Sequence, residues 1–112
     1  MTDYIQLQIT FPTEESAMSL AEILVTKKLV ACAQVIGPIK SVYYWQNSLE
    51  KNHEILLLAK TKKNLFDAIV DEIRKHHSYQ CPQIVALPLV CGSNDYLHWV
   101  DDAVLQEFLA RR

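Results

Sequence analysis

Two long runs of apolar and β-branched residues, separated by a short polar segment, dominate the hydrophobic pattern of the chain. The first run extends from Cys32 to Trp45 and the second from Leu49 to Thr61, and residues of these types favour β-strands. Asn47 lies in the polar segment and readily adopts the left-handed backbone conformation of a tight turn. The pattern therefore predicts one long antiparallel hairpin.

The predicted hairpin is long for the domain that carries it. A strand from Cys32 to Trp45 would extend over about 45 Å at about 3.3 Å per residue, whereas a domain of this size has a radius of gyration of about 13 Å. Gly37-Pro38 marks a bend or bulge, since proline donates no hydrogen bond to a sheet. Beyond it, Val42 to Trp45 place apolar groups on both faces of the strand. We expect another copy of the chain to cover this overhang.

A strand and a helix precede the hairpin. Apolar and polar residues alternate from Ile5 to Phe11, which predicts a half-buried strand. Thr13 is suited to cap a helix, and apolar residues recur at spacings of three and four from Ala17. We expect this helix to extend to about Lys28.

A second helix, a strand and a third helix follow the hairpin. Apolar spacing predicts a second helix over Lys62–His77, with Thr61 or Lys62 at its entry. A connection over Ser78–Pro82 leads to a strand over Ile84–Val90. A turn over Cys91–Asp95 then leads to a third helix over Asp95–Leu109. The order βαββαβ followed by a helix is typical of a ferredoxin-like α+β sandwich, in which both first helices lie on one face of an antiparallel sheet. We expect a single domain over residues 1–112.

Composition and charge narrow the functional classes. The 112 residues are 50% hydrophobic and 21% charged, with a formal net charge of -2. No basic run or glycine-aromatic signature indicates a nucleic-acid-binding surface. The N-terminal residues lack the pattern of a signal peptide, and no apolar run is long enough to span a membrane. We therefore expect a soluble, cytoplasmic protein that binds neither nucleic acid nor membrane.

The densest group of reactive side chains lies where the second predicted helix ends. His76, His77, Tyr79 and Cys81 occur there, and imidazole and thiolate are natural ligands of copper and zinc. Adjacent histidines point about 100° apart on a helix, so both reach one ion only if the last turn unwinds. The alternative interpretation is a helix-capping pair with exposed imidazoles. The odd number of cysteines and the lack of C-x-x-C spacing argue against a disulfide scaffold or a zinc ribbon.

A second group of candidate residues is dispersed along the chain. Glu54 and Lys60 share one face of the second hairpin arm, where they could form an ion pair, bind an anion between subunits or be solvated. Tyr96 and Trp99 are spaced to lie on one side of the third helix, where packing is the commonest role. Lys60, Tyr79 and Trp99 are the candidates for a ligand cleft. No P-loop, G-x-S-x-G or paired catalytic carboxylate motif is present, so we expect no enzymatic activity.

Several segments of the chain together carry a family pattern. They are Leu29-Val-Ala-Cys-Ala33, Ser41-Val-Tyr-Tyr-Trp45, Glu54 with Lys60-Thr61, His76-His77-Ser78-Tyr79-Gln80-Cys81-Pro82-Gln83 and Tyr96-Leu97-His98-Trp99. In this order and spacing they resemble the CutA divalent-cation tolerance proteins over essentially the whole chain. The resemblance implies a ferredoxin-like protomer in a tight homotrimer, similar in architecture to the PII nitrogen signalling proteins, with the long hairpin reaching onto a neighbour.

The resemblance also implies a function in tolerance to divalent metals, copper in particular. In some members copper binds through a cysteine of the first strand and through the paired histidines, which match His76 and His77 here. Ile9 stands at the position of that cysteine, and Gln80 and Gln83 replace the two carboxylates of the family pattern. The loss of a thiolate and of anionic oxygen ligands weakens a divalent site.

Two functional hypotheses follow. The first is a homotrimeric, non-enzymatic protein of divalent-metal tolerance that binds copper(II) or another divalent cation through His76, His77 and Cys81, whose thiol lies near the histidines in sequence. The alternative is a PII-like sensor or scaffold that binds a small anion or a partner protein in the clefts between subunits.

Overall fold

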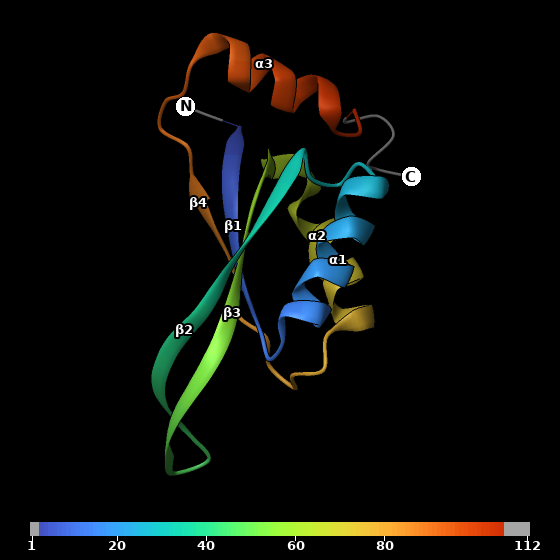
Figure 1. Cartoon of the computed structure of the whole chain (residues 1–112). Coiled ribbons are helices and arrows are strands. Elements are labelled where there is room, and N and C mark those ends of the chain that lie inside the picture. Colours follow the sequence, from blue (N-terminus) through green and yellow to red (C-terminus); the bar gives the residue numbers. More distant parts are fainter. Residues whose placement is uncertain (1–2, 107–112) are drawn as a thin grey trace.

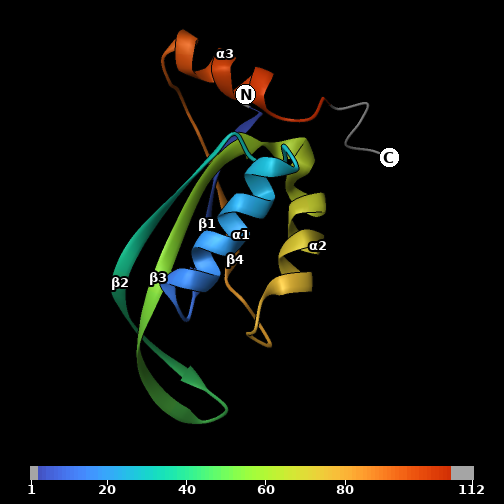
Figure 2. The same ribbon diagram turned by 45° about the vertical axis from the view of Figure 1, so that its right-hand side comes forward.

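The structure is a computed structural model that describes residues 3–106, and it contains a four-stranded antiparallel sheet and three α-helices within these residues. The elements are β1 (Tyr4–Phe11), α1 (Glu14–Thr26), β2 (Cys32–Trp45), β3 (Ser48–Lys62), the 3-10 turn η1 (Lys63–Leu65), α2 (Phe66–His76), β4 (Ile84–Pro88) and α3 (Asn94–Ala103). The strand order is β2-β3-β1-β4. Helices α1 and α2 lie side by side on one face of the sheet, while α3 crosses one end (Figures 1 and 2). The predicted ferredoxin-like α+β fold with an additional helix is confirmed.

The hydrophobic core lies between the sheet and the pair of helices α1 and α2. Alternate residues of the two central strands face these helices, and Leu7, Ile9 and Leu57 are fully buried there. The fully buried helix residues that meet them are Leu24, Ile69 and Ile73. Burial of each such side chain contributes about 1.5–3 kcal/mol, so this layer holds the strands and helices together.

Only part of the long hairpin is supported by the rest of the sheet. β2 and β3 remain paired as far as Trp45 opposite Ser48, whereas β1 pairs with β3 only between Ile55 and Lys62. The hairpin beyond Ile55 therefore overhangs the domain (Figure 1), as the hydrophobic pattern predicted.

Two local features of the hairpin agree with the sequence. Gln46 and Asn47 have φ angles of 51° and 66°, in the left-handed region that a two-residue hairpin turn requires. The register of β2 against β3 shifts between Ile36 and Ile39, at the predicted bulge. Before the shift, even-numbered residues of β2 lie opposite even-numbered residues of β3. After it, odd-numbered residues of β2 lie opposite even-numbered residues of β3. The bulge therefore decides which β2 side chains share a face with Glu54.

Helix α1 begins as predicted but ends earlier. The hydroxyl of Thr13 accepts a hydrogen bond from the backbone N–H of Ser16 at 3.1 Å, which is the expected N-cap. The helix ends at Thr26 rather than at Lys28, because Lys28 adopts a φ of 59° in the left-handed region.

Helix α2 begins later than predicted. Lys62 belongs to β3 and pairs with Tyr4, and a 3-10 turn separates it from the first α-helical residue, Phe66. Thr61 is fully buried, and its hydroxyl donates a hydrogen bond to the carbonyl oxygen of Leu29 at 2.6 Å. Neither residue predicted for the entry of this helix therefore lies at the start of α2, whose N-cap is Leu65.

Strand β4 is shorter than predicted. It ends at Pro88 rather than at Val90. The N–H of Leu89 still donates to the carbonyl oxygen of Tyr4, the first residue of β1, at 3.0 Å, and the pairing goes no further. Val90 is consequently 86% exposed.

The predicted helix over Asp95–Leu109 is also shorter in the structure. α3 ends at Ala103, because Val104 is extended and its side chain is buried. The next N–H, of Leu105, donates to the carbonyl oxygen of Lys28 at 2.9 Å. The end of the predicted helix lies outside the described residues.

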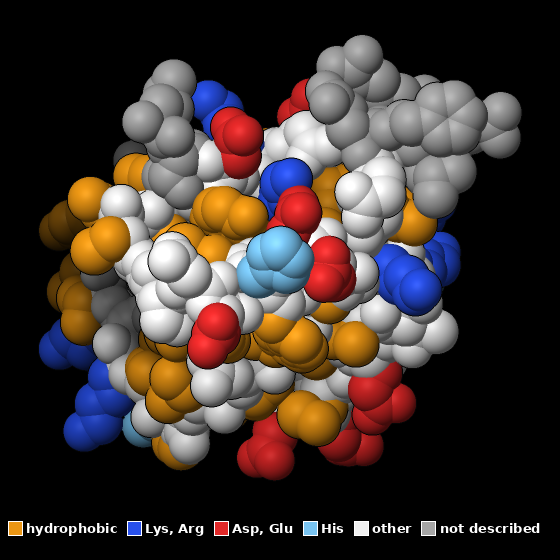
Figure 3. All heavy atoms as spheres, turned by 90° about the horizontal axis from the view of Figure 1, so that it is seen from above, with side chains coloured by type: hydrophobic (Ala, Val, Ile, Leu, Met, Phe, Trp, Pro, Cys, Tyr) orange, Lys and Arg blue, Asp and Glu red, His pale blue; other side chains and the backbone are white. Residues whose placement is uncertain are grey.

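The second face of the sheet is largely uncovered. The strand registers bring together five apolar side chains on it, which we call the open-face patch: Ile36, Leu56, Leu58, Val85 and Leu87. Helix α3 reaches this face only at one end, where the Tyr96 hydroxyl lies 3.3 Å from the Cys32 sulfur. At the end of the molecule that α3 crosses, seen from above, hydrophobic side chains are interspersed with acidic and basic ones (Figure 3). No described helix has the length and apolar character needed to cross a membrane.

Candidate functional site

His77 is held by hydrogen bonds at both ring nitrogens. Its Nδ1 accepts from the backbone N–H of Tyr79 at 3.1 Å, so the ring proton lies on Nε2, which donates to the carbonyl oxygen of Thr10 at 2.7 Å. The ring also stacks on Phe11, with 4.6 Å between centroids. In this position His77 attaches the connection after α2 to the end of β1, and neither nitrogen has a free lone pair for a metal.

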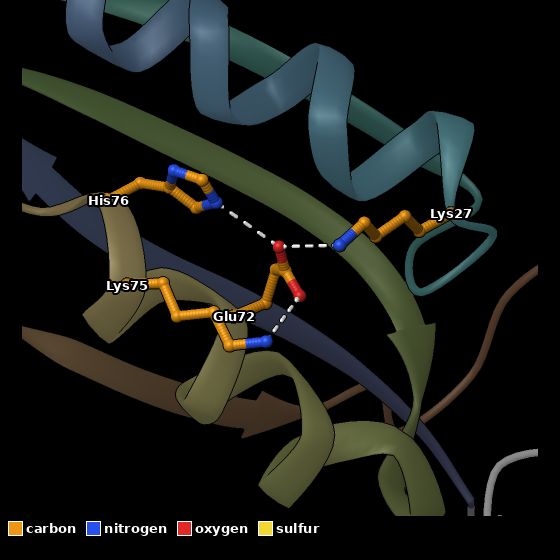
Figure 4. Close-up of polar contacts among 4 residues, drawn as sticks. All are labelled: Lys27, Glu72, Lys75 and His76. Atoms are coloured by element: carbon orange, nitrogen blue, oxygen red, sulfur yellow. Dashed lines mark hydrogen bonds and ion pairs between the residues drawn. The ribbon is translucent and has the colours of Figure 1, made fainter.

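His76 points to a different part of the molecule. Its Nε2 lies 3.2 Å from a carboxylate oxygen of Glu72, which also accepts from Lys27 of the segment after α1 at 2.8 Å, while Lys75 lies 3.7 Å from the other oxygen (Figure 4). The hydrogen bond from Lys27, followed by that from His76, lowers the pKa of Glu72 against the opposing effect of desolvation. The cluster therefore links the C-terminal end of α1 to the second half of α2.

The predicted metal ligands do not converge. His76 is directed at Glu72 and His77 at Thr10, while Cys81 is exposed on the connection beyond them. Within residues 3–106, no group of three or more His, Cys, Asp or Glu side chains is placed to hold a metal ion. The alternative interpretation, a helix-capping pair with exposed imidazoles, fits only in part. The backbone N–H of His77 donates to the carbonyl oxygen of Ile73 at the end of α2, but its imidazole is half-buried and hydrogen-bonded.

A cleft of about 560 Å³ lies between the overhanging hairpin and the connection that follows α2. Its walls include Tyr43 and Trp45 from β2, Glu54 from β3, and Tyr79 and Cys81 from the connection. We call it the hairpin cleft. It exists because the hairpin continues past the end of β1 while the connection, attached through its histidine, passes alongside.

Glu54 is the charged side chain among the described residues that line the hairpin cleft, and it is buried. It is only 7% exposed, and its Oε2 accepts a hydrogen bond from the Tyr79 hydroxyl at 2.9 Å. Burial and this hydrogen bond raise the pKa of Tyr79 far above its ordinary value, so the phenol remains a hydrogen-bond donor. Both residues were candidates in the sequence, but their contact was not predicted. The sequence feature that indicates a buried carboxylate is a glutamate directly before the apolar stretch of the strand.

The other predicted cleft residues lie elsewhere. The Nζ of Lys60 donates to the side-chain oxygen of Gln34 at 3.1 Å, and Trp99 packs against Tyr96 on α3, with 5.7 Å between ring centroids. Neither lines the hairpin cleft. Of the three residues predicted to form a ligand cleft, only Tyr79 therefore does so in a single protomer.

The sequence profile of the CutA1 divalent ion tolerance proteins matches residues 5–103. The chain belongs to the CutA1 family. A divalent-cation tolerance protein CutA from Thermus thermophilus is 38% identical over 92 residues, which cover 82% of this chain and 89% of that protein. A solved CutA1 structure from the same organism has a TM-score of 0.88 at 35% identity and covers 90% of this chain and 98% of its own.

Plant members of the CutA1 family are longer than this chain. The rice protein CutA 1, chloroplastic, is 33% identical over 99 residues, which cover 88% of this chain but only 56% of the rice protein. The chain thus spans about half the length of this relative, and the common part is the CutA1 domain itself.

Removal of the Glu72 carboxylate will change the pH dependence of stability. The folded-state pKa of Glu72 is lowered from its ordinary value of 4.5, so its contribution is present above that pH and is lost as pH falls through the folded-state value. We expect Glu72→Gln to unfold more easily than the parent at pH 7, with a difference that shrinks below about pH 4.5. Denaturant titrations over this pH range measure it. Lys27→Met should reproduce the loss, and a difference independent of pH would contradict the assignment.

Removal of the Tyr79 hydroxyl will destabilise the protein. Tyr79→Phe leaves a buried Glu54 oxygen without its hydrogen bond, which costs about 1–3 kcal/mol. The matched control is Tyr44→Phe at the hairpin end, where the side chain is 75% exposed. Denaturant titration should show a loss of stability for the first variant only; equal stability of the two would mean that the Tyr79–Glu54 contact contributes nothing.

Proposed function

We propose that this CutA1 chain acts in tolerance to divalent cations as a non-enzymatic homotrimer with a PII-like architecture. The observation that carries the proposal is the uncovered apolar face of the sheet. Within that face Ile36 of β2 and Val85 and Leu87 of β4 are 48%, 43% and 45% exposed.

The open-face patch favours self-association. Apolar surface of this extent in water is unfavourable and marks an interaction site. The overhanging hairpin adds a two-stranded ribbon that is marginally stable without cover. A neighbouring copy can cover both, since a hairpin that projects beyond its own domain reaches the domain of another protomer.

Trimer formation is tested by solution mass. We expect light scattering to give three times the 12.9 kDa chain mass. Val85→Asp places a charge within the open-face patch and should give a monomer, because burial of an unpaired carboxylate is strongly unfavourable. The control is Val25→Asp on α1, whose residue is similarly exposed at 42% but lies on the opposite side of the sheet. A monomeric parent protein would refute the assembly.

We propose copper(II) or another divalent cation as the bound metal, with His76 as its first contact. The His76 side chain is 43% exposed, and the ring nitrogen that does not face Glu72 points away from it (Figure 4). Cys81 is an exposed thiol that can supply a soft ligand. His77 joins them only if it releases Thr10, so the complete ligand set requires a rearrangement of the connection after α2.

The metal site is tested by calorimetric titration of the reduced, metal-free protein with copper(II), at neutral pH and against a weak competing chelator. We expect saturable binding that weakens by about tenfold or more in His76→Ala, since each lost imidazole removes a first-row metal ligand. His98→Ala is the matched control, because His98 lies on α3 and its side chain is 80% exposed. Unchanged affinity in the His76→Ala/His77→Ala double variant would exclude this site.

A cytoplasmic location is part of the same proposal. It is supported by the three cysteines, Cys32, Cys81 and Cys91, all of which are free thiols, whereas disulfides are common in proteins of oxidising compartments.

A further inference from the structure

The Glu72 carboxylate and the His76 imidazole have the spacing of a metal-binding pair. They lie one helical turn apart on α2, and side chains at i and i+4 share one side of a helix, as the two histidines of an H-E-x-x-H zinc motif do. We propose that the divalent cation binds between Nε2 of His76 and Glu72, and that the ammonium group of Lys27 holds this position in its absence. The inference rests on the proposed metal function and adds a second ligand and an internal competitor to it.

The distance between the two donor atoms suits a common ion. Nε2 of His76 lies 3.2 Å from Oε2 of Glu72. Nitrogen and oxygen ligands lie about 2.0–2.2 Å from zinc, so two neighbouring ligands of a tetrahedral or octahedral ion are about 2.8–3.6 Å apart. The observed distance falls within this range. The pair therefore needs neither a change in the backbone of α2 nor the release of His77 from Thr10.

Lys27 supplies a positive charge at the same carboxylate oxygen. Its Nζ donates to Oε2 of Glu72 at 2.8 Å, whereas Lys75 lies 3.7 Å from the other oxygen (Figure 4). The Glu72 side chain is only 7% exposed, and a buried carboxylate without a cation beside it is strongly unfavourable. Lys27 therefore keeps the carboxylate paired in the metal-free protein.

A divalent ion can displace this ammonium group. The Lys27 side chain is 53% exposed and follows the last residue of α1, so its charged end can turn into water. A divalent ion carries twice the charge of an ammonium group, and its attraction to a carboxylate rises in proportion. It also accepts the lone pair of an imidazole nitrogen, which is a favoured ligand of copper and zinc. Lys27 and the ion therefore compete for Oε2 of Glu72.

The site remains accessible in the trimer proposed above. Helices α1 and α2 cover one face of the sheet (Figures 1 and 2), and the open-face patch lies on the other. Glu72 and His76 belong to α2, and Lys27 follows α1, so none of them lies on the overhanging hairpin. A neighbouring copy that covers the open face and the hairpin therefore leaves this site in contact with water.

The competitor is tested by calorimetric titration of the reduced, metal-free protein and of Lys27→Met with copper(II). Removal of the ammonium group should tighten copper binding about tenfold, although the same change destabilises the metal-free protein. Damage to the fold cannot produce both effects. The matched control is Lys75→Met, which removes the same charge near the other carboxylate oxygen and should change the affinity less than about threefold. Equal gains in the two variants, or no gain in Lys27→Met, would overturn the competitor.

The second ligand is tested by Glu72→Gln. This variant should bind copper(II) about tenfold more weakly or worse, because an amide oxygen lacks the charge of a carboxylate. Asp71→Asn is the matched control, since Asp71 is an exposed neighbour on α2, and it should leave the affinity unchanged. Circular dichroism at the titration temperature establishes that each variant is folded. Unchanged affinity in Glu72→Gln would overturn the inference, and Lys27→Met decides it if Glu72→Gln unfolds.

Nitrogen NMR separates the inference from the proposed function. Zinc(II) is diamagnetic, and in the zinc-saturated protein we expect the ¹⁵N signal of His76 Nε2 to report the bound metal. Zinc on Nδ1 would leave His76 a metal contact but overturn the inference, because that nitrogen faces away from Glu72 (Figure 4).

The copper titrations make the same separation. Binding that is lost in His76→Ala but unchanged in Lys27→Met and Glu72→Gln would overturn the inference alone. Binding by Lys27→Met but not by the parent would support the internal competitor and contradict copper binding by the parent chain. Absence of binding in both would reject the inference together with the metal site.

Discussion

The unequal length of β3 and β1 is the constraint on which the other features of this molecule depend. β3 is paired with β2 along its whole length, but β1 accompanies it only from Ile55 to Lys62. Where β1 is present, helices cover one face and a core forms. Where β1 is absent, the hairpin projects with both faces unsupported, and this projection creates both the hairpin cleft and the need for a neighbour.

The connection after α2 converts this overhang into a defined cleft. His77 attaches the connection to the end of β1 through Thr10 and Phe11, and Tyr79 then reaches the Glu54 carboxylate on the hairpin. Three separate parts of the chain are thus joined at the point where the sheet narrows. The imidazole of His77, a candidate metal ligand in the sequence, therefore stabilises this junction in the structure.

Membership of the CutA1 family and the geometry of the protomer direct attention to different surfaces. The family description concerns divalent ions, and His76 and Cys81 are the accessible donors near the end of α2. The hairpin cleft, by contrast, has one carboxylate and aromatic walls among its described lining residues.

The sequence by itself determined the fold class, the long hairpin, its turn at Asn47, its bulge at Gly37-Pro38 and the family. Each of these depends on local backbone preference or on the spacing of apolar residues, which are readable along the chain. It did not determine where α2 begins or where α3 ends, since the pairing of Lys62 with Tyr4 and the burial of Val104 are tertiary contacts.

The site was decided by the tertiary structure. The two adjacent histidines differ in partner because Thr10, 67 residues away from His77 in sequence, lies beside one of them, and Glu72, a single helical turn away, lies beside the other. The buried Glu54 carboxylate receives its hydrogen bond from Tyr79, which lies 25 residues further along the chain in the connection after α2. The residue types determine which atoms can donate a hydrogen bond, accept one or bind a metal. The partner of each atom depends on which distant segments the sheet register brings within hydrogen-bond distance.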